Sequence, residues 1–141
     1  AESVRRATDP LRVAREQAAD LIVVKVAPLG GVRRALAIVA ECGLPAVVSS
    51  ALDTSVGIAA GVALAAALPQ LPYACGLGTV QLLGGDVLAD SLVAEGGWLA
   101  PRRVVPRPGL LARYAAPAER LAWWQDRLAA CHAQLLRAAR A

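Results

Sequence analysis

The stretch Leu21-Ile-Val-Val-Lys-Val26 is almost continuously apolar, and Pro28 follows it closely. Its short length and its β-branched residues favour a strand over a helix. A strand that is apolar on both faces is typical of a parallel sheet covered by helices. The stretch therefore predicts an α/β fold in which Lys25 lies near the carboxyl end of a buried strand.

Helical and strand-like segments alternate on both sides of this stretch. Asp9-Pro10 has the form of a helix N-cap followed by proline at the first helical position. Gly43 follows an amphipathic segment, at the position where helices commonly end in a left-handed residue. This alternation indicates parallel strands joined by right-handed crossovers. The expected elements are helices over 9–19, 32–42 and 55–68, and short strands over 21–26, 46–49 and 73–75.

The composition is that of one ordinary folded domain. Of the 141 residues, 57% are hydrophobic and only 18% are charged, which argues against disorder. The longest apolar run, over 56–68, is shorter than the roughly 20 residues that cross a bilayer. We therefore expect that run to be a buried helix, and we expect no membrane partner.

The spacing of the cysteines and the net charge of the chain argue against several classes of function. The three cysteines, Cys42, Cys75 and Cys131, show no CxxC spacing, and His132 is the single histidine, so neither zinc nor a disulfide scaffold is indicated. Reduced thiols in a cytoplasmic protein are the simplest interpretation. The net charge of +4 comes largely from scattered Arg, without a basic block, so we expect no nucleic-acid partner.

Lys25 is the first candidate catalytic residue. It is the single Lys in a chain in which every other residue of the Lys and Arg total of 15 is Arg. An ammonium within an apolar strand is costly, and a desolvated Lys can give up its proton near neutral pH whereas Arg cannot. Acid–base or electrostatic catalysis would explain the choice of Lys, and a snorkelling lysine at the strand end is the structural alternative.

Polar residues also follow the second expected strand. Ser49 and Ser50 end that strand, and Asp53 and Ser55 come just before the next helix. Asp53 or Ser55 is expected to cap the helix, whose N-terminus also offers free N–H groups to an anion. We take Ser49, Ser50 and Asp53 as candidate substrate-binding residues, with plain capping as the alternative.

The third expected strand leads into a glycine-rich turn. Gly76 and Gly78 would permit close approach of the backbone to a ligand, although a purely structural turn is as good an explanation. Functional side chains gather at the carboxyl ends of strands in parallel α/β folds. Lys25, the Ser49-Ser50 pair and the Gly76–Gly78 turn thus indicate one side of a barrel.

Three stretches together resemble the enolase superfamily, in the form found in o-succinylbenzoate synthases of actinobacterial type. Asp20-Leu-Ile-Val-Val-Lys-Val-Ala-Pro-Leu-Gly-Gly31 resembles barrel strand six of that superfamily. Ala46-Val-Val-Ser-Ser-Ala-Leu-Asp-Thr-Ser-Val-Gly57 resembles strand seven, and Pro72-Tyr-Ala-Cys-Gly-Leu-Gly-Thr79 resembles the strand-eight segment. The resemblance runs in order from Glu2 to about Asp90. It implies the C-terminal portion of a (β/α)8 barrel over 1–100, followed by a C-terminal extension over 101–141 with an amphipathic helix.

The resemblance implies a chemistry. Such enzymes dehydrate a cyclohexadiene carboxylate to 2-succinylbenzoate in menaquinone synthesis. One lysine removes the proton next to the carboxylate, Mg²⁺ held by three acids stabilises the enediolate, and a second lysine on strand six faces the intermediate from the other side. Lys25 matches that second lysine. Ser49, Ser50 and the Gly76–Gly78 turn match the region that binds the substrate carboxylates.

The chain departs from the family pattern at its start. The strands that carry the other lysine and the first two metal acids are missing, as is the N-terminal capping domain. Ala1-Glu2-Ser3 stands where a motif like Asp-Glu-Ser would supply the third acid, so no metal ligand is assigned, and Glu2 is at most an outer residue. We therefore expect a fragment that is inactive alone and whose partner is the missing half of the barrel.

Two alternatives stay open. N-succinylamino acid racemases share much of the scaffold, with two lysines acting on opposite faces of the substrate. A different class is a non-catalytic α/β module in which the Gly76–Thr79 turn holds an anion and Lys25 supplies a counter-charge. The module would bind its ligand without Mg²⁺ and would tolerate Lys25→Arg, whereas the enzyme would not.

Overall fold

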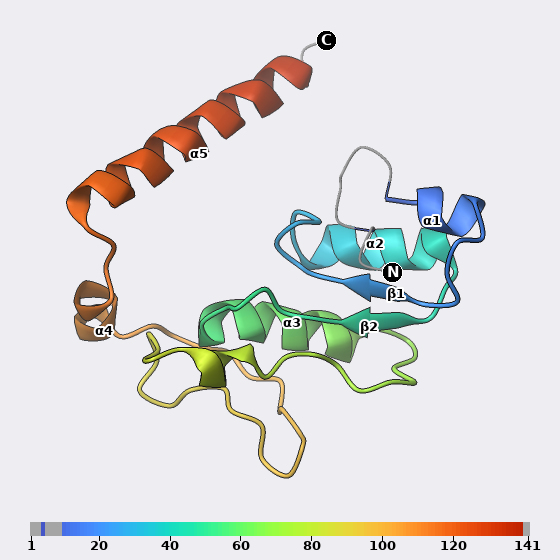
Figure 1. Ribbon diagram of the computed structural model, residues 1–141, viewed down its shortest axis with the longest axis horizontal. Coiled ribbons are helices and arrows are strands. Elements are labelled where there is room, and N and C mark those ends of the chain that lie inside the picture. Colours follow the sequence, from blue (N-terminus) through green and yellow to red (C-terminus); the bar gives the residue numbers. More distant parts are fainter. Residues whose placement is uncertain (1–3, 5–9, 140–141) are drawn as a thin grey trace.

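The centre of the fold is a pair of parallel strands. The computed structural model describes Val4 and residues 10–139. Within these, β1 (Ile22–Val24) pairs with β2 (Ala46–Val48), with Ile22 opposite Ala46 and Val24 opposite Val48. Helix α2 (Val32–Cys42) connects the two strands, and α3 (Ser55–Ala67) follows β2 and contacts both β2 and α2 (Figure 1). The observed βαβα order is that expected of a parallel sheet covered by helices. The other elements are α1 (Arg12–Arg15), η1 (Thr79–Leu82), α4 (Pro108–Arg113) and α5 (Ala118–Ala138).

The core forms where the two strands meet the two long helices. Ile22, Val24 and Val48 are fully buried, as the apolar run around Lys25 predicted. Helix α2 has the predicted bounds and ends at Gly43, whose φ of 66° is the left-handed conformation that glycine adopts without strain. The predicted apolar helix after β2 is also confirmed. It buries residues on several sides, namely Ser55, Ile58, Gly61, Val62, Leu64 and Ala65.

Two predicted elements are shorter than expected. The N-terminal helix covers only Arg12–Arg15 and stops before Gln17, which has a φ of 50° that does not continue a helix. Its expected cap, Asp9, lies outside the described residues. The third strand expected near 73–75 is absent among the described residues, where a single parallel bridge joins Ser49 to Gly76. Residues 73 and 74 are exposed, and a short segment between Pro72 and the Gly76–Gly78 turn has little burial to hold it against β2.

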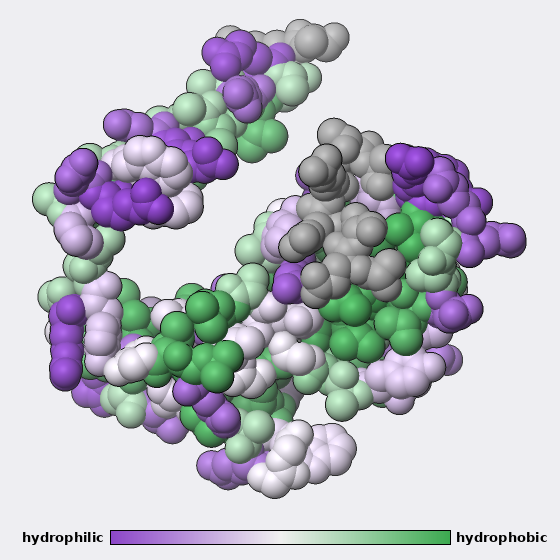
Figure 2. Space-filling view, viewed as in Figure 1, coloured by the Kyte–Doolittle hydropathy of each residue, from purple (hydrophilic) through white to green (hydrophobic). Residues whose placement is uncertain are grey.

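The C-terminal part extends away from this α/β body. Residues 83–107 form a long loop, and α5 projects from the body beyond α4 (Figure 1). The predicted amphipathic helix is confirmed at Ala118–Ala138, but none of its residues is buried. Figure 2 shows open space between α5 and the body, with hydrophobic surface of the body beside it. Among the residues described, none of the helices combines the length and the apolar character that crossing a membrane requires.

Candidate active site

Lys25 and Ser49 lie side by side at the carboxyl ends of β1 and β2. Lys25 directly follows β1 and is half-buried. The backbone N–H of Ser49 donates a hydrogen bond to the carbonyl oxygen of Val24, at 2.9 Å. Because the strands are parallel, this bond places the residue after Val24 and the residue after Val48 at the same edge of the sheet. The fold therefore brings together two of the residues that the sequence singled out.

Ser50 joins the Gly76 turn to that edge. The Ser50 N–H donates to the carbonyl of Gly76 at 2.9 Å, and the Gly76 N–H donates to the carbonyl of Val48, also at 2.9 Å. The hydroxyl of Ser50 donates to the Gly76 carbonyl at 3.0 Å and lies 2.8 Å from the Thr79 hydroxyl oxygen. Ser50 is only 7% exposed. The polar atoms of Ser50 are therefore engaged in holding the turn.

Ser49 and the two glycines of the turn are more open. The Ser49 hydroxyl makes a long hydrogen bond of 3.4 Å to the Ser50 carbonyl, and Ser49 is half-buried. A Cβ on Gly76 would lie 3.2 Å from the Ser49 Oγ, so glycine allows the turn to approach Ser49 closely. A Cβ on Gly78 would meet nothing within 4 Å, so packing does not require glycine there. Gly76 and Gly78 are both exposed, and Gly76 lies at this edge.

Asp53 folds back onto its own loop. Its Oδ2 accepts a hydrogen bond from the Ala51 N–H at 2.9 Å. Its side chain packs so closely on the first turn of α3 that a Cβ on Gly57 would lie 2.6 Å from the Asp53 Cβ. Thr54 is the residue at the N-cap of α3 and makes no side-chain capping bond. The expectation that Asp53 or Ser55 caps α3 is therefore wrong.

Asp86 caps α3 from the long loop. Its carboxylate accepts a hydrogen bond from the Ser55 N–H at 3.0 Å and another from the Ser55 hydroxyl. The fully buried Ser55 Oγ in turn accepts the N–H of Leu92 at 2.8 Å. Burial alone would raise the pKa of the Asp86 carboxyl, but hydrogen bonds, led by the two from Ser55, hold that pKa below its ordinary value. The Asp86 carboxylate of the chain thus occupies the place at Ser55 where the sequence analysis considered a bound anion.

Sequence reasoning missed Asp86. Its partner Ser55 is 31 positions away, and a capping residue is normally sought within the local sequence. One signal was present, because Asp86 is the single acidic residue between Asp53 and Asp90. That isolation marks Asp86 as unusual within a long neutral segment, but the residue it contacts follows only from the fold.

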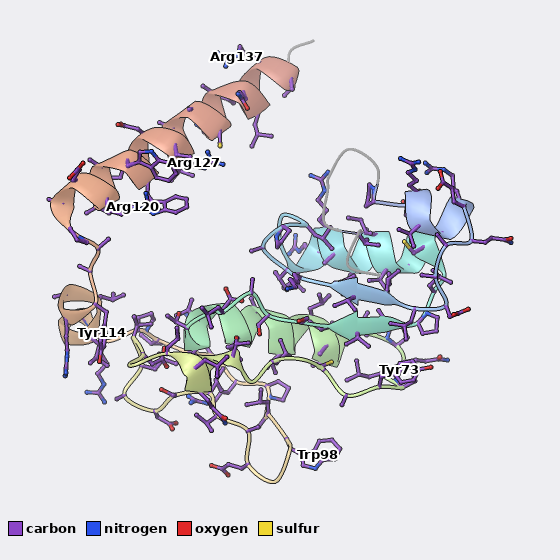
Figure 3. All side chains as sticks on the ribbon, viewed as in Figure 1. Tyr73, Trp98, Tyr114, Arg120, Arg127 and Arg137 are labelled. Atoms are coloured by element: carbon purple, nitrogen blue, oxygen red, sulfur yellow. The ribbon has the colours of Figure 1, made fainter. Side chains whose placement is uncertain are left out.

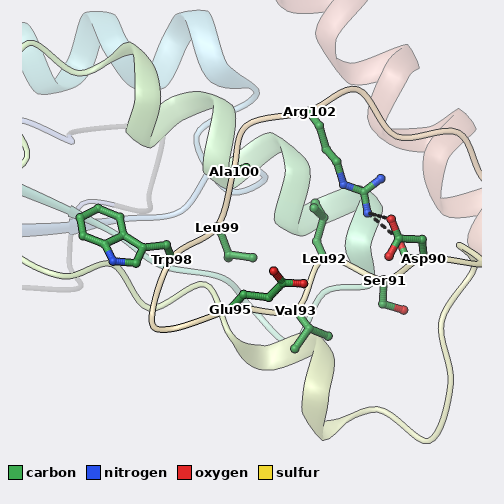
Figure 4. A pocket seen from close by; sticks show the side chains of 9 residues that line it. All are labelled: Asp90, Ser91, Leu92, Val93, Glu95, Trp98, Leu99, Ala100 and Arg102. Atoms are coloured by element: carbon green, nitrogen blue, oxygen red, sulfur yellow. Dashed lines mark hydrogen bonds and ion pairs between the residues drawn. The ribbon is translucent and has the colours of Figure 1, made fainter.

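Two hollows lie outside the strand ends. One, of about 280 Å³, is formed within the 90–102 loop, where Arg102 pairs with Asp90 at 2.9 Å (Figure 4). The other, of about 330 Å³, lies where the Tyr114 ring packs against Gly85, near the N-terminus of α3. Neither hollow includes Lys25, Ser49 or Gly76. The candidate site at the strand ends is therefore separate from both hollows.

A comparison of the sequence with known protein families identifies the family of this chain. Residues 1–115 match the family described as "Enolase C-terminal domain-like". The chain belongs to this family. The expected resemblance to the enolase superfamily and the expected fold class are thereby confirmed. The described βαβα unit carries Lys25 and Ser49 at the carboxyl ends of two parallel strands.

Several curated relatives of this enolase C-terminal domain-like chain are o-succinylbenzoate synthases. The one from Thermobifida fusca is 59% identical over 132 residues, which is 94% of this chain and 41% of the relative. The one from Mycolicibacterium smegmatis is 58% identical over the same shares. The one from Mycobacterium tuberculosis strain H37Ra is 53% identical over 135 residues, or 96% of this chain and 41% of the relative. This chain thus spans about 41% of the length of these relatives.

Solved structures agree on the fold of this enolase C-terminal domain-like chain. A muconate lactonizing enzyme superposes with a TM-score of 0.71 over 81% of this chain and 34% of its own, at 24% identity. A muconate cycloisomerase from Pseudomonas fluorescens gives a TM-score of 0.61 over 86% of this chain and 33% of its own, at 30% identity. At such identity the first likeness supports the fold alone.

The described residues do not fit the metal that the resemblance implies. Mg²⁺ prefers carboxylate oxygens, and no group of three or more His, Cys, Asp or Glu residues that could hold a metal occurs within Val4 and 10–139. Glu2, the candidate outer residue, lies outside that part of the chain. The site as described therefore supplies a lysine, a hydroxyl and backbone N–H groups, but not a magnesium centre.

Proposed function

We propose that this chain provides part of the active site of an o-succinylbenzoate synthase, a carbon–oxygen lyase that dehydrates a cyclohexadiene carboxylate to 2-succinylbenzoate in menaquinone synthesis. The observation that carries the proposal is the 53–59% identity to curated proteins of that name. Since the chain spans about 41% of their length, the activity is proposed for a protein that also contains the remaining barrel strands and the capping domain.

In this proposal Lys25 faces the reacting carbons of the substrate. Removal of the proton next to the substrate carboxylate leaves negative charge on an enediolate, which a nearby ammonium stabilises. Lys25 is half-buried beside Ser49, and partial desolvation strengthens its interaction with that charge. A lysine can also transfer a proton near neutral pH, and an arginine cannot. Lys25→Arg keeps the positive charge but removes the group that can transfer a proton. The variant should therefore lose dehydration activity.

Ser49 and the Gly76–Gly78 turn are proposed to bind substrate carboxylates. The Ser49 hydroxyl makes only a long internal hydrogen bond, so it is the better placed of the two serines to donate to a ligand. The Ser50 hydroxyl is occupied with Gly76 and Thr79, so its contribution is to hold the turn beside Ser49. The exposed Gly76 and Gly78 allow a carboxylate to approach the backbone without steric hindrance.

Mg²⁺ is proposed to be held by residues outside the described part of this chain. When bound, it would stabilise the enediolate oxygens. The acids of the described residues do not gather around the strand ends, so no step of the mechanism is assigned to a metal through them. We also propose a cytoplasmic setting, because the three cysteines are free thiols, which persist in a reducing compartment.

A grafted enzyme tests this function. The matching 132-residue segment of the Thermobifida fusca synthase is replaced by the corresponding residues of this chain, and dehydration is followed by formation of 2-succinylbenzoate. We expect the grafted synthase to be active. Lys25→Ala and Lys25→Arg should each lower its kcat by about 10²- to 10⁴-fold, the range typical of a lost acid–base group. Turnover of an N-succinylamino acid by the same protein tests the racemase alternative.

Arg34→Lys is the matched control for the lysine variants. Arg34 is exposed on α2, so exchanging one basic residue for another there should leave kcat within about 2-fold, as is usual for surface changes. A folded grafted protein with an intact Mg²⁺ site and no dehydration activity would contradict the proposal. Full activity of Lys25→Arg would instead favour a role for Lys25 as a simple counter-charge.

A further inference from the structure

Leu52 has a strained backbone in the loop between β2 and α3. Its φ is 60°, in the left-handed region, and apart from the glycines only Gln17 shares a positive φ within the described residues. This conformation is unfavourable for an ordinary L-residue, because it brings the Cβ too close to the following carbonyl oxygen. The side chain does not recover that cost by burial, since Leu52 is 57% exposed. Glycine or asparagine would adopt the same backbone more easily.

Asp53 and Gly57 support the strained conformation. The Asp53 Oδ2 accepts the N–H of Ala51, the residue before Leu52, at 2.9 Å and so closes the turn around Leu52. The side chain of Asp53 occupies the space that glycine leaves at position 57, where a Cβ would lie 2.6 Å from the Asp53 Cβ and 2.8 Å from its Cγ. The carboxylate thus has a structural task that needs an acceptor oxygen and does not need the negative charge.

The loop lies at the edge where the candidate site lies. Leu52 comes two residues after Ser50, whose N–H pairs with the Gly76 carbonyl at this edge. Strained residues persist where the surrounding structure fixes them, and they cluster at binding and catalytic sites. An exposed leucine in such a position offers an apolar surface beside groups that suit carboxylates.

We propose that Asp53 is a positioning residue that holds Leu52 in its left-handed conformation, so that the Leu52 side chain contacts the apolar ring of the ligand bound at this edge. The inference rests on the proposed function and deepens it, because it assigns the recognition of the ring to Leu52 while Ser49 and the Gly76–Gly78 turn bind carboxylates. Asp53 then acts on the ligand only through Leu52.

Variants of the grafted synthase separate the backbone from the side chain at position 52. Leu52→Asn keeps nearly the same shape and favours the left-handed conformation, but it is polar. We expect Leu52→Asn to leave the thermal midpoint unchanged or raised while KM for the substrate increases about 10- to 100-fold, the range for a lost apolar contact. An unchanged KM in a folded Leu52→Asn protein would overturn the proposal that the Leu52 side chain contacts the ring of the ligand. It would indicate that Leu52 faces another part of the protein.

Variants of Asp53 separate the role of its acceptor oxygen from the role of its negative charge. Asp53→Asn keeps an acceptor oxygen and loses the charge, so it should raise KM much less than Asp53→Ala does. Asp53→Ala loses the acceptor, and Gly57→Ala displaces the side chain, so both should raise KM as Leu52→Asn does. If Asp53→Asn instead matches Asp53→Ala, the carboxylate acts directly on the ligand, and the positioning role is overturned.

Amide exchange at Ala51 tests the positioning without catalysis. In the grafted protein, Asp53→Ala should accelerate exchange of the Ala51 N–H by about 5-fold or more, as expected when a hydrogen bond is lost, whereas Asp53→Asn should not. Equal exchange in the parent and Asp53→Ala proteins would overturn the positioning role. If the parent neither turns over substrate nor binds 2-succinylbenzoate, the proposed function fails. An active parent in which Leu52→Asn has no effect refutes the present inference alone.

Discussion

The Asp86 carboxylate accepts both the backbone N–H and the hydroxyl of Ser55, the first residue of α3. This contact joins the long loop after η1 to the loop that carries Ser49, Ser50 and Asp53. Since Ser55 is fully buried, removal of Asp86 leaves the Ser55 N–H and hydroxyl hydrogen without their acceptor, although the Ser55 Oγ still accepts the Leu92 N–H. The arrangement therefore bears on stability as well as on the geometry of the candidate site.

Asp86→Ala should destabilise the fold. We expect the free energy of unfolding to fall by about 1–2 kcal/mol, as for the loss of a helix cap. Asp86→Asn should be milder, because the amide oxygen still accepts one of the two hydrogen bonds. Chemical denaturation followed by circular dichroism measures both variants. Asp90→Ala, at an exposed carboxylate, is the matched control, and equal stability of Asp86→Ala and Asp90→Ala would contradict the capping role.

The free energy of unfolding should also depend on pH, through the ionisation of the Asp86 carboxyl group. Because the folded pKa of Asp86 is lowered, its contribution to stability is fully present above the unfolded pKa, about 3.9. That contribution is lost as the pH falls through the lower folded pKa. A denaturation series from neutral to acid pH should therefore show a smaller difference between wild type and Asp86→Asn at the acid end. A difference that grows toward acid pH would have the wrong sign.

Gly61→Ala should introduce overpacking beneath α3. A Cβ at position 61 would lie 2.6 Å from Cδ2 of the buried Leu77, so the variant should lose about 1–3 kcal/mol of unfolding free energy. Leu77→Val removes the clashing atom, and the double variant should lose less than the sum of the single losses. Gly84→Ala, where an added Cβ meets nothing within 4 Å, serves as control. Additive losses would show that the two positions do not interact.

The cysteines should differ in reactivity. Burial raises the pKa of the Cys42 thiol, and the neighbouring Glu41 carboxylate raises it further. Since the thiolate is the reactive form, a soluble thiol reagent at pH 8 should modify the exposed Cys131 first and Cys42 only after unfolding. Peptide mass mapping over time gives the order. Modification of Cys42 and Cys131 at similar rates in the folded protein would contradict the buried position of Cys42.

Changes on α5 should leave the stability of the α/β body intact. Leu128 is 72% exposed. The guanidinium of Arg120, a residue that Figure 3 shows on α5, lies over the rings of Trp123 and Trp124 of the same helix. We expect Leu128→Glu to change the free energy of unfolding by less than about 0.5 kcal/mol. The core variant Ile58→Ala should cost about 2–5 kcal/mol in the same measurement. A loss for Leu128→Glu that approaches the Ile58→Ala value would show that α5 packs on the body.

Local features of the sequence were sufficient for the long helices and the paired strands. The apolar periodicity and Gly43 predicted α2 at its observed bounds, because a helix ends where the pattern and a left-handed residue coincide. The third strand was predicted wrongly, because a suitable composition over 73–75 was not matched by burial. The roles of Lys25, Ser49, Ser50, Gly76 and Gly78 stay predictions, although the fold gathers the first four at one edge.

By itself the sequence determined the α/β class, the bounds of α2 and the choice of Lys25 as the residue of interest, because these follow from local periodicity and from one unusual residue type. The tertiary structure alone decided that Asp86 caps α3, that Ser50 holds the Gly76 turn and that Leu52 is strained. Those features depend on contacts between segments about 30 positions apart or on a single backbone angle. Such contacts form only when burial of the core fixes the segments against one another, and no local pattern encodes that arrangement.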